Sequence, residues 1–173
     1  SGDKVRLRGL ESNGARLSGN TISFNAYGNV LSLKYGDSFQ GENGPFNGAS
    51  LFKNSTGLVS AKNLILPTEL KSACYSYMFD GCTSLTSAPA LPATTLKGSC
   101  YSGMFNNCTS LETAPELPAT IMASNCYSSM FSGCASLTTA PVLPATTLAD
   151  YCYYIMFNNC TSLETAPELS ATT

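Results

Sequence analysis

The stretch CYSYMFDGCTSLTSAPALPATTL, residues 74–96, decides the fold, because it recurs along the chain at intervals of 26 residues. Copies that begin at residues 74, 100 and 126 are complete, and a fourth copy begins at residue 152 and runs to Thr173. Each copy places two cysteines eight residues apart. Self-similarity at a fixed period is the sequence signature of stacked repeat architectures. We call each 26-residue unit a coil and number the four coils in chain order.

A weaker copy precedes coil one. LFKNSTGLVSAKNLILP, residues 51–67, keeps Phe52 and Leu58 where coil one has Phe79 and Leu85. Both cysteines are replaced there, by Asn47 and Ser55, although the apolar positions persist. We therefore interpret the sulfurs as core fillers rather than ligands. Residues 47–73 form a degenerate coil, and the repeat domain covers residues 47–173.

A longer period of 52 residues overlies the shorter one. Coils two and four share MFNNCTSLETAPEL, whereas coils one and three carry glycine at positions 81 and 133 and have no glutamate. This alternation indicates that a pair of coils was duplicated.

Local rules predict a helix of about two turns at the start of each coil. In coil one, Cys74 lies four residues before Met78 and Tyr75 four residues before Phe79, which would gather them on one apolar face. Glycine and asparagine readily adopt the left-handed conformation that ends a helix. They occupy one recurring position, which predicts helix ends at Gly81, Asn107, Gly133 and Asn159. The candidate N-caps are the polar residues Ser99, Asn125 and Asp150.

A short strand is predicted after this helix. SLTSAPALP, residues 84–92, would turn Leu85, Ala88 and Leu91 inward. Pro89 recurs in every coil and cannot donate to a β-ladder, so it should weaken pairing there. Strands stack about 4.8 Å apart and helices about 10 Å apart, so the stack should bend, with the strands on its concave face.

Residues 1–46 lack the repeat. KVRLRGL, TISFNAY and VLSLKYG are β-branched or alternating runs separated by glycine and asparagine. They predict a small β-rich N-terminal cap that shields the first coil. The fold class expected is an α/β repeat solenoid, in which short parallel strands and short helices stack behind this cap.

Composition limits the functions open to the chain. Its 173 residues carry a net charge of −2, only 12% are charged, and none is histidine. No basic surface exists for nucleic acid, and the usual general base near neutral pH is absent. The paired carboxylates Glu112 and Glu116 would lie on an open, duplicated face that lacks tryptophan, unlike a glycosidase cleft. We expect that the chain is not an enzyme and that it binds neither a cofactor nor nucleic acid.

The motif MFxxCTSL, the proline-rich segment after it and the length of the coil resemble the BspA-like leucine-rich-repeat family of bacterial surface proteins. GDKVRLRG and AYGNVLSL also resemble the segment that leads into such arrays in gut-bacterial members. The resemblance implies a leucine-rich-repeat-like solenoid, an extracellular or cell-surface location, and adhesion or ligand binding without catalysis. The coil here is longer than the commoner family repeat and has an Ala-Pro insertion in the strand.

The cysteines admit more than one interpretation. Eight residues of spacing does not match the CxxC pairs of zinc sites, and helical geometry would hold each pair too far apart for a disulfide. Buried free thiols that act as small hydrophobes are the favoured interpretation. Disulfides between coils remain the alternative, because an extracellular protein meets oxidising conditions.

The outward strand face is the candidate binding surface, since repetition there would align like side chains. Three columns of hydroxyl and acidic residues run along it, and the candidate site residues are Thr86, Glu112, Thr113, Glu116, Thr138, Thr139, Glu164, Thr165 and Glu168. A host or matrix protein, or a glycan, is the expected partner. A structural spacer that holds another domain away from the cell surface is the alternative function. Coil four should leave an uncovered apolar side and an open strand near Leu163. We therefore expect either further sequence beyond this coil or end-to-end self-association.

Overall fold

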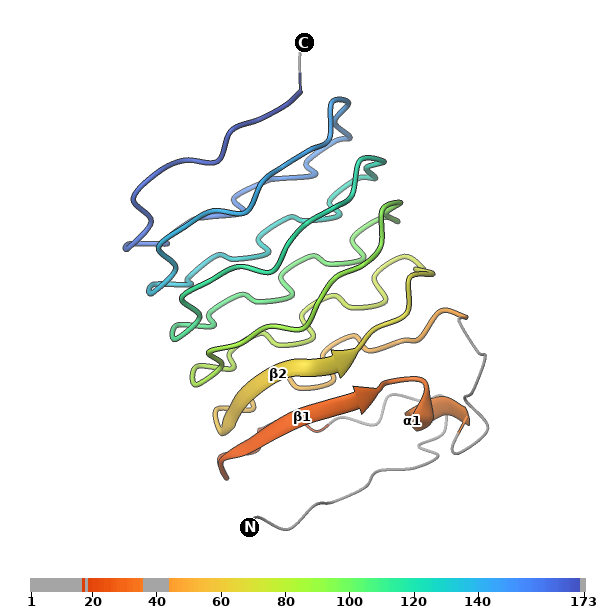
Figure 1. Cartoon of the computed structure of the whole chain (residues 1–173), viewed down its shortest axis with the longest axis vertical. Helices are drawn as coiled ribbons and strands as arrows, with labels where there is room; N and C mark the ends of the chain where they lie inside the picture. Colours follow the sequence, from red (N-terminus) through yellow and green to blue (C-terminus); the bar gives the residue numbers. More distant parts are fainter. Residues whose placement is uncertain (1–16, 18, 36–43, 172–173) are drawn as a thin grey trace.

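The computed structural model describes Leu17, residues 19–35 and residues 44–171. Strand β1 (Phe24–Asn29) and strand β2 (Leu58–Ile65) pair in parallel as a two-stranded sheet, and the short helix α1 (Ser32–Tyr35) follows β1. Beyond β2, the described residues form turns and isolated bridges, and successive coils lie one above the next (Figure 1). No helix in the described part is long and apolar enough to cross a bilayer.

The helices predicted at the start of each coil are wrong. Residues 72–81 form consecutive turns in which alternate N–H groups donate to the carbonyl three residues back, as Met78 does to Tyr75 at 3.2 Å. Every fourth residue is left-handed, with φ of 56° at Ala73, 55° at Tyr77 and 73° at Gly81. A left-handed residue in each turn prevents an α-helix from propagating. The proposed N-caps Ser99 and Asn125 are themselves left-handed, with φ of 55° and 57°.

The remaining N–H groups of these turns reach the next coil. Tyr75 donates to the Cys100 carbonyl and Phe79 to the Met104 carbonyl, each at 2.9 Å. The same register joins coil two to three and coil three to four, as in the bond from Tyr127 to the Cys152 carbonyl at 3.0 Å. N–H groups therefore donate alternately within their own turn and to the next coil, so the backbone donors of these turns all have partners in coils one to three. The stack was predicted to bend because helices would be spaced more widely than strands. The turns replace those helices and are themselves hydrogen-bonded from coil to coil, so this cause of bending is absent.

The opposite side of each coil pairs weakly, as the proline column predicts. Single parallel bridges join Thr113 to Thr139 before the prolines of their coils, and Leu143 to Leu169 after them. No ladder among the described residues passes through the proline positions of coils one to four, because proline cannot donate. The predicted strands thus shrink to isolated bridges, although Leu85 and Leu91 point inward and are buried, as expected.

The core consists of columns of identical side chains. In coils one to three, both cysteines and the tyrosine, methionine, phenylalanine and leucine of the motif are buried. Neighbouring rings stack, with centroids 5.4 Å apart for Phe79 and Phe105 and 5.9 Å apart for Tyr75 and Tyr101. The predicted inward orientation of the sulfurs and rings is confirmed.

The second cysteine of each coil does more than fill space. The Cys82 thiol donates to the Phe52 carbonyl at 3.0 Å, and the Cys108 thiol donates to the Phe79 carbonyl at 3.2 Å. In the degenerate coil, the hydroxyl of buried Ser55 makes the equivalent bond to the Leu17 carbonyl at 2.6 Å. Serine can replace cysteine in this column because both donate one hydrogen to the preceding segment.

The stack begins before the degenerate coil. Leu17 donates to the Leu51 carbonyl at 2.7 Å and Gly19 donates to the Lys53 carbonyl at 3.1 Å, which repeats the register between coils. We call Leu17 and residues 19–29 the first rung. TISFNAY contributes to β1 as expected, whereas VLSLKYG contains α1 instead of a strand. The KVRLRGL segment lies outside the described residues.

Candidate functional site

The predicted binding surface is exposed along the stack. All nine of its residues are exposed to solvent and recur in the columns that the sequence predicts; they are Thr86, Glu112, Thr113, Glu116, Thr138, Thr139, Glu164, Thr165 and Glu168. The bridge between Thr113 and Thr139 places two of them on adjacent coils. The fold therefore aligns like side chains along one face, as the repeat requires.

Part of the hydroxyl chemistry on this face is already in use. The Thr86 hydroxyl donates to the Val59 carbonyl at 3.1 Å, and the Thr138 hydroxyl donates to the Glu112 carbonyl at 3.4 Å. Each donor is engaged with the preceding coil, while the oxygen lone pairs remain as acceptors. At Thr86 and Thr138 the face thus offers acceptors to a ligand.

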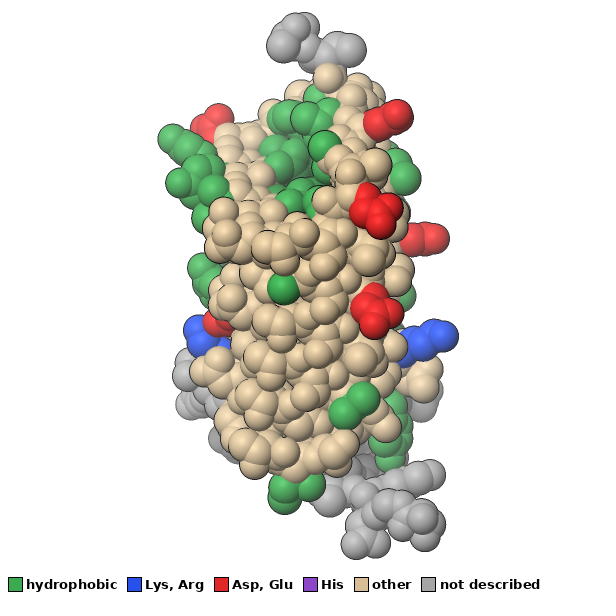
Figure 2. Space-filling view, turned by 90° about the vertical axis from the view of Figure 1, so that its left-hand side faces the viewer, with side chains coloured by type: hydrophobic (Ala, Val, Ile, Leu, Met, Phe, Trp, Pro, Cys, Tyr) green, Lys and Arg blue, Asp and Glu red, His purple; other side chains and the backbone are tan. Residues whose placement is uncertain are grey.

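The carboxylates on this face form no ion pair with the part of the chain that the structure describes. Glu112, Glu116, Glu164 and Glu168 have no ion-pair partner among the described residues. Figure 2 shows acidic side chains set apart along one side of the molecule rather than gathered into a patch. Because the glutamates of this face occur only in coils two and four, coil three separates the two pairs of negative charges. This spacing suits shallow contact with a donor-rich ligand more than capture of a metal ion.

A second polar cluster was not anticipated from the sequence. Lys53 Nζ lies 2.8 Å from the carboxylate of buried Asp80, and the Asn106 amide donates to the other oxygen at 3.0 Å. The three residues occupy one column in successive coils, so the 26-residue alignment itself carried the signal. The cluster satisfies a carboxylate in the turns and leaves no open coordination site.

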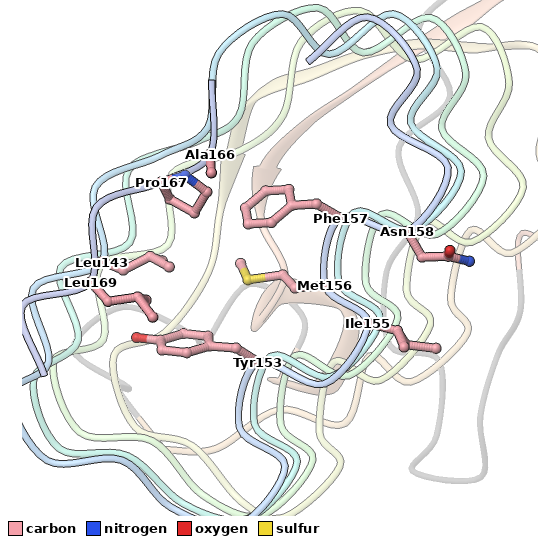
Figure 3. A pocket seen from close by; sticks show the side chains of 9 residues that line it. All are labelled: Leu143, Tyr153, Ile155, Met156, Phe157, Asn158, Ala166, Pro167 and Leu169. Carbon is pink, nitrogen blue, oxygen red and sulfur yellow. The ribbon is translucent and has the colours of Figure 1, made fainter. Parts of the chain in front are cut away.

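An apolar hollow of about 500 Å³ opens at the C-terminal end of the stack (Figure 3). Its lining residues are Leu143, Tyr153, Ile155, Met156, Phe157, Asn158, Ala166, Pro167 and Leu169. Tyr153 and Phe157 are only partly buried, whereas their counterparts in coil three, Tyr127 and Phe131, are buried beneath coil four. Figure 2 shows apolar side chains exposed at this end. The expected uncovered side of coil four is therefore present.

The thiols have little reactive chemistry in the folded chain. All eight cysteines are free, and only Cys160 is not fully buried. Burial raises the pKa of Cys82, Cys100 and Cys134 to about 12, although backbone hydrogen bonds oppose the shift. No cluster of three or more metal-ligating side chains occurs in the described part of the chain. Buried neutral thiols are poor nucleophiles and poor ligands.

No family model, curated protein or solved structure matches the chain. The functional argument consequently depends on the residues and their geometry.

Proposed function

We propose that this chain is a non-catalytic binding or adhesion module with a leucine-rich-repeat-like solenoid architecture, of the BspA-like type. Its ligand is a host or matrix protein or a glycan that contacts the strand face, and its setting is extracellular or at a bacterial cell surface. The observation that supports this function best is the exposure of all nine predicted threonine and glutamate residues in aligned columns. An open, repetitive face of this kind favours extended ligands over small molecules, which need concave pockets.

The chemistry of the face narrows the ligand class. Unpaired carboxylates and hydroxyl oxygens act as acceptors, so the preferred ligand presents hydroxyl or cationic donors at repeated intervals. A glycan chain or a basic protein segment has this property. Only nine lysines and arginines occur in the whole chain, which disfavours nucleic acid.

A structural spacer is the second candidate. The coil-to-coil hydrogen bonds run through coils one to four in one register, and each coil buries its side chains against its neighbours. Such a stack is mechanically continuous and would hold an attached domain at a distance without any ligand.

A charge-reversal experiment separates the two functions. The chain is screened against arrays of glycans and matrix proteins, and the double variant Glu112→Lys/Glu116→Lys is then compared with it on each hit. The matched control is Glu69→Lys/Asp150→Lys, which makes the same charge change at exposed positions outside the nine-residue surface.

Binding that the Glu112/Glu116 variant weakens by about tenfold, equivalent to about 1.4 kcal/mol, while the control binds normally, supports the binding function. No hit on either array, with the protein folded by circular dichroism, favours the spacer. Equal losses in both double variants would show that net charge, rather than this face, controls binding.

A further inference from the structure

The buried core does not specify the order in which the coils stack. Coils one to three bury the same apolar side chains at the same positions, and one backbone register joins each coil to the next. A folding chain that skipped one coil and left it looped out would therefore keep matching apolar columns and matching hydrogen bonds. The order must be specified where the coils differ, and some of these positions lie on the turns that stack along the molecule (Figure 1).

The first such position is Tyr77 of coil one, whose counterparts in the next three coils are Gly103, Ser129 and Ile155. A Cβ built on Gly103 would collide with the Tyr77 ring. Lys53 of the preceding coil also lies over this ring, with Nζ 5.2 Å from the centroid, which favours the position that the ring occupies. Tyr77 therefore fits against coil two, which has glycine, but not against coil three or coil four, where a Cβ would meet the ring.

The second position alternates between asparagine and glycine along the stack, as Asn54, Gly81, Asn107, Gly133 and Asn159. A Cβ at position 81 would collide with the Asn54 side-chain oxygen, and a Cβ at position 133 with that of Asn107. Asparagine is thus accommodated by glycine in the following coil and disfavoured by a second asparagine. A stack that skipped only coil one, or only coil three, would set two asparagines against each other.

The third position carries charge. Lys53 Nζ lies 2.8 Å from one carboxylate oxygen of Asp80, and the Asn106 amide donates to the other at 3.0 Å. Coil three has Ser132 at this position. The first two positions permit one skip, in which the degenerate coil stacks directly on coil three. Lys53 would then face Ser132 and lose its ion pair with Asp80.

We propose that these positions on the turns fix the order of the coils while the chain folds. Every skip among the degenerate coil and coils one to four sets the Tyr77 ring or an asparagine against a Cβ, or breaks the ion pair between Lys53 and Asp80. A skipped coil also forfeits its own burial, so the misordered stacks are traps on the folding pathway rather than alternative native states. The turns act against these traps, which the repeated core would otherwise permit. This inference does not depend on the strand-face ligand.

Interrupted refolding with limited proteolysis tests the proposal. The full chain is unfolded in urea with reductant, returned to native conditions and exposed briefly to chymotrypsin after increasing times, and mass spectrometry identifies the cleavage sites. Chymotrypsin cuts after aromatic residues in exposed, flexible chain. Tyr101 and Phe105 of coil two are fully buried in the ordered stack. Cleavage at these residues, at times when coils one and three are already protected, reports that coil two has been skipped.

Ser129→Gly is the decisive variant. It removes the Cβ that keeps coil three from accepting Tyr77, and it leaves the contacts between coils one and two unchanged. The fraction of refolding chains cleaved within coil two should rise by about tenfold over the wild type, since the misordered stack no longer contains the collision. Ser99→Gly is the matched control, because Ser99 is also a partly buried, left-handed serine of the turns, with φ of 55° against 57° at Ser129.

Tyr77→Ser tests the same contact from the other side. It removes the ring and should also raise cleavage within coil two, while Ser99→Gly behaves as the wild type does. Equal cleavage of coil two in the wild type, Ser129→Gly and Tyr77→Ser would overturn the proposal. Cleavage that rises equally in coils one, two and three would overturn it too, because it would show general loosening rather than a skipped coil.

Discussion

At the scale of single residues, the second cysteine column is a chain of hydrogen-bond donors. The Cys82, Cys108, Cys134 and Cys160 thiols each donate to a phenylalanine carbonyl of the preceding coil, over 3.0 to 3.2 Å. Each of these carbonyls also accepts an N–H bond from its own coil, as Phe79 does from Cys82 at 3.0 Å. The thiol therefore satisfies the second lone pair of a carbonyl that has no access to water.

This arrangement predicts the order of two substitutions. Cys108→Ser should retain the donor, as Ser55 does in the degenerate coil, whereas Cys108→Ala removes it and leaves a small cavity. We expect Cys108→Ala to lower the free energy of unfolding by about 1 to 3 kcal/mol and Cys108→Ser to lower it less. Urea denaturation gives both values. A serine variant less stable than the alanine variant would show that the site is purely apolar.

Buried ionisable groups make the fold sensitive to alkali. Burial raises the pKa of Cys82, Cys100 and Cys134 from an ordinary value of 9.0 to about 12, and it also raises the pKa of Tyr101. Below about pH 9 the thiols are protonated in both the folded and the unfolded chain. Between pH 9 and 12 the unfolded chain ionises first, so stability is lost as pH rises.

Chemical denaturation at a series of pH values checks this prediction. The free energy of unfolding should be flat up to about pH 8 and should then fall by about 1.4 kcal/mol per pH unit for each thiol that ionises only in the unfolded chain. A profile that stays flat through pH 11 would mean that the thiols are either oxidised or exposed. Alkylation of all eight cysteines in the denatured chain without reductant distinguishes these two cases.

At the scale of the structural element, the first part of each coil is a series of four-residue turns. The sequence predicted the period, the inward columns and the left-handed positions Gly81, Asn107, Gly133 and Asn159, all of which the structure confirms. The helix prediction failed because apolar pairs four residues apart fit a 3.6-residue helix and a four-residue turn equally well over so short a stretch. The distinguishing signal lay in Ser99, Gly103 and Asn107, which place small or left-handed-tolerant residues at every fourth position.

One position of the repeat alternates between glycine and asparagine, as Gly81, Asn107, Gly133 and Asn159. A Cβ at position 133 would collide with the Asn107 side-chain oxygen, which gives a physical reason for the 52-residue period that can be tested inside the stack. Gly133→Ala should lower the free energy of unfolding by about 2 kcal/mol or more, through left-handed strain plus collision with Asn107. Adding Asn107→Gly should recover the part due to collision. Gly28→Ala measures the strain alone, because no described atom lies near its Cβ. Additive effects of Gly133→Ala and Asn107→Gly in a double-mutant cycle would refute the packing explanation.

At the scale of the whole molecule, alternate hydrogen bonds make one cooperative body from units that cannot fold singly. The candidate surface was accessible from the sequence, because the 26-residue period fixed which threonines and glutamates share a column. The sequence could not predict that the Thr86 and Thr138 hydroxyls donate to the preceding coil, since these bonds depend on how far adjacent coils are offset. The bonds from the turns of one coil to the carbonyls of the next were likewise hidden, because they are made by the backbone.

The most direct test of the account is residue-resolved amide hydrogen exchange on this chain, at a concentration at which sedimentation shows a monomer. In coil three, every amide from Cys126 to Cys134 should be protected, because alternate N–H groups bond within the turn and to coil four. In coil four, Cys152, Tyr154, Met156 and Asn158 should remain protected, whereas Tyr153, Ile155, Phe157 and Asn159 should exchange rapidly. Uniform protection along coil four, or rapid exchange at Tyr127 and Phe131, would contradict the stacked-turn structure.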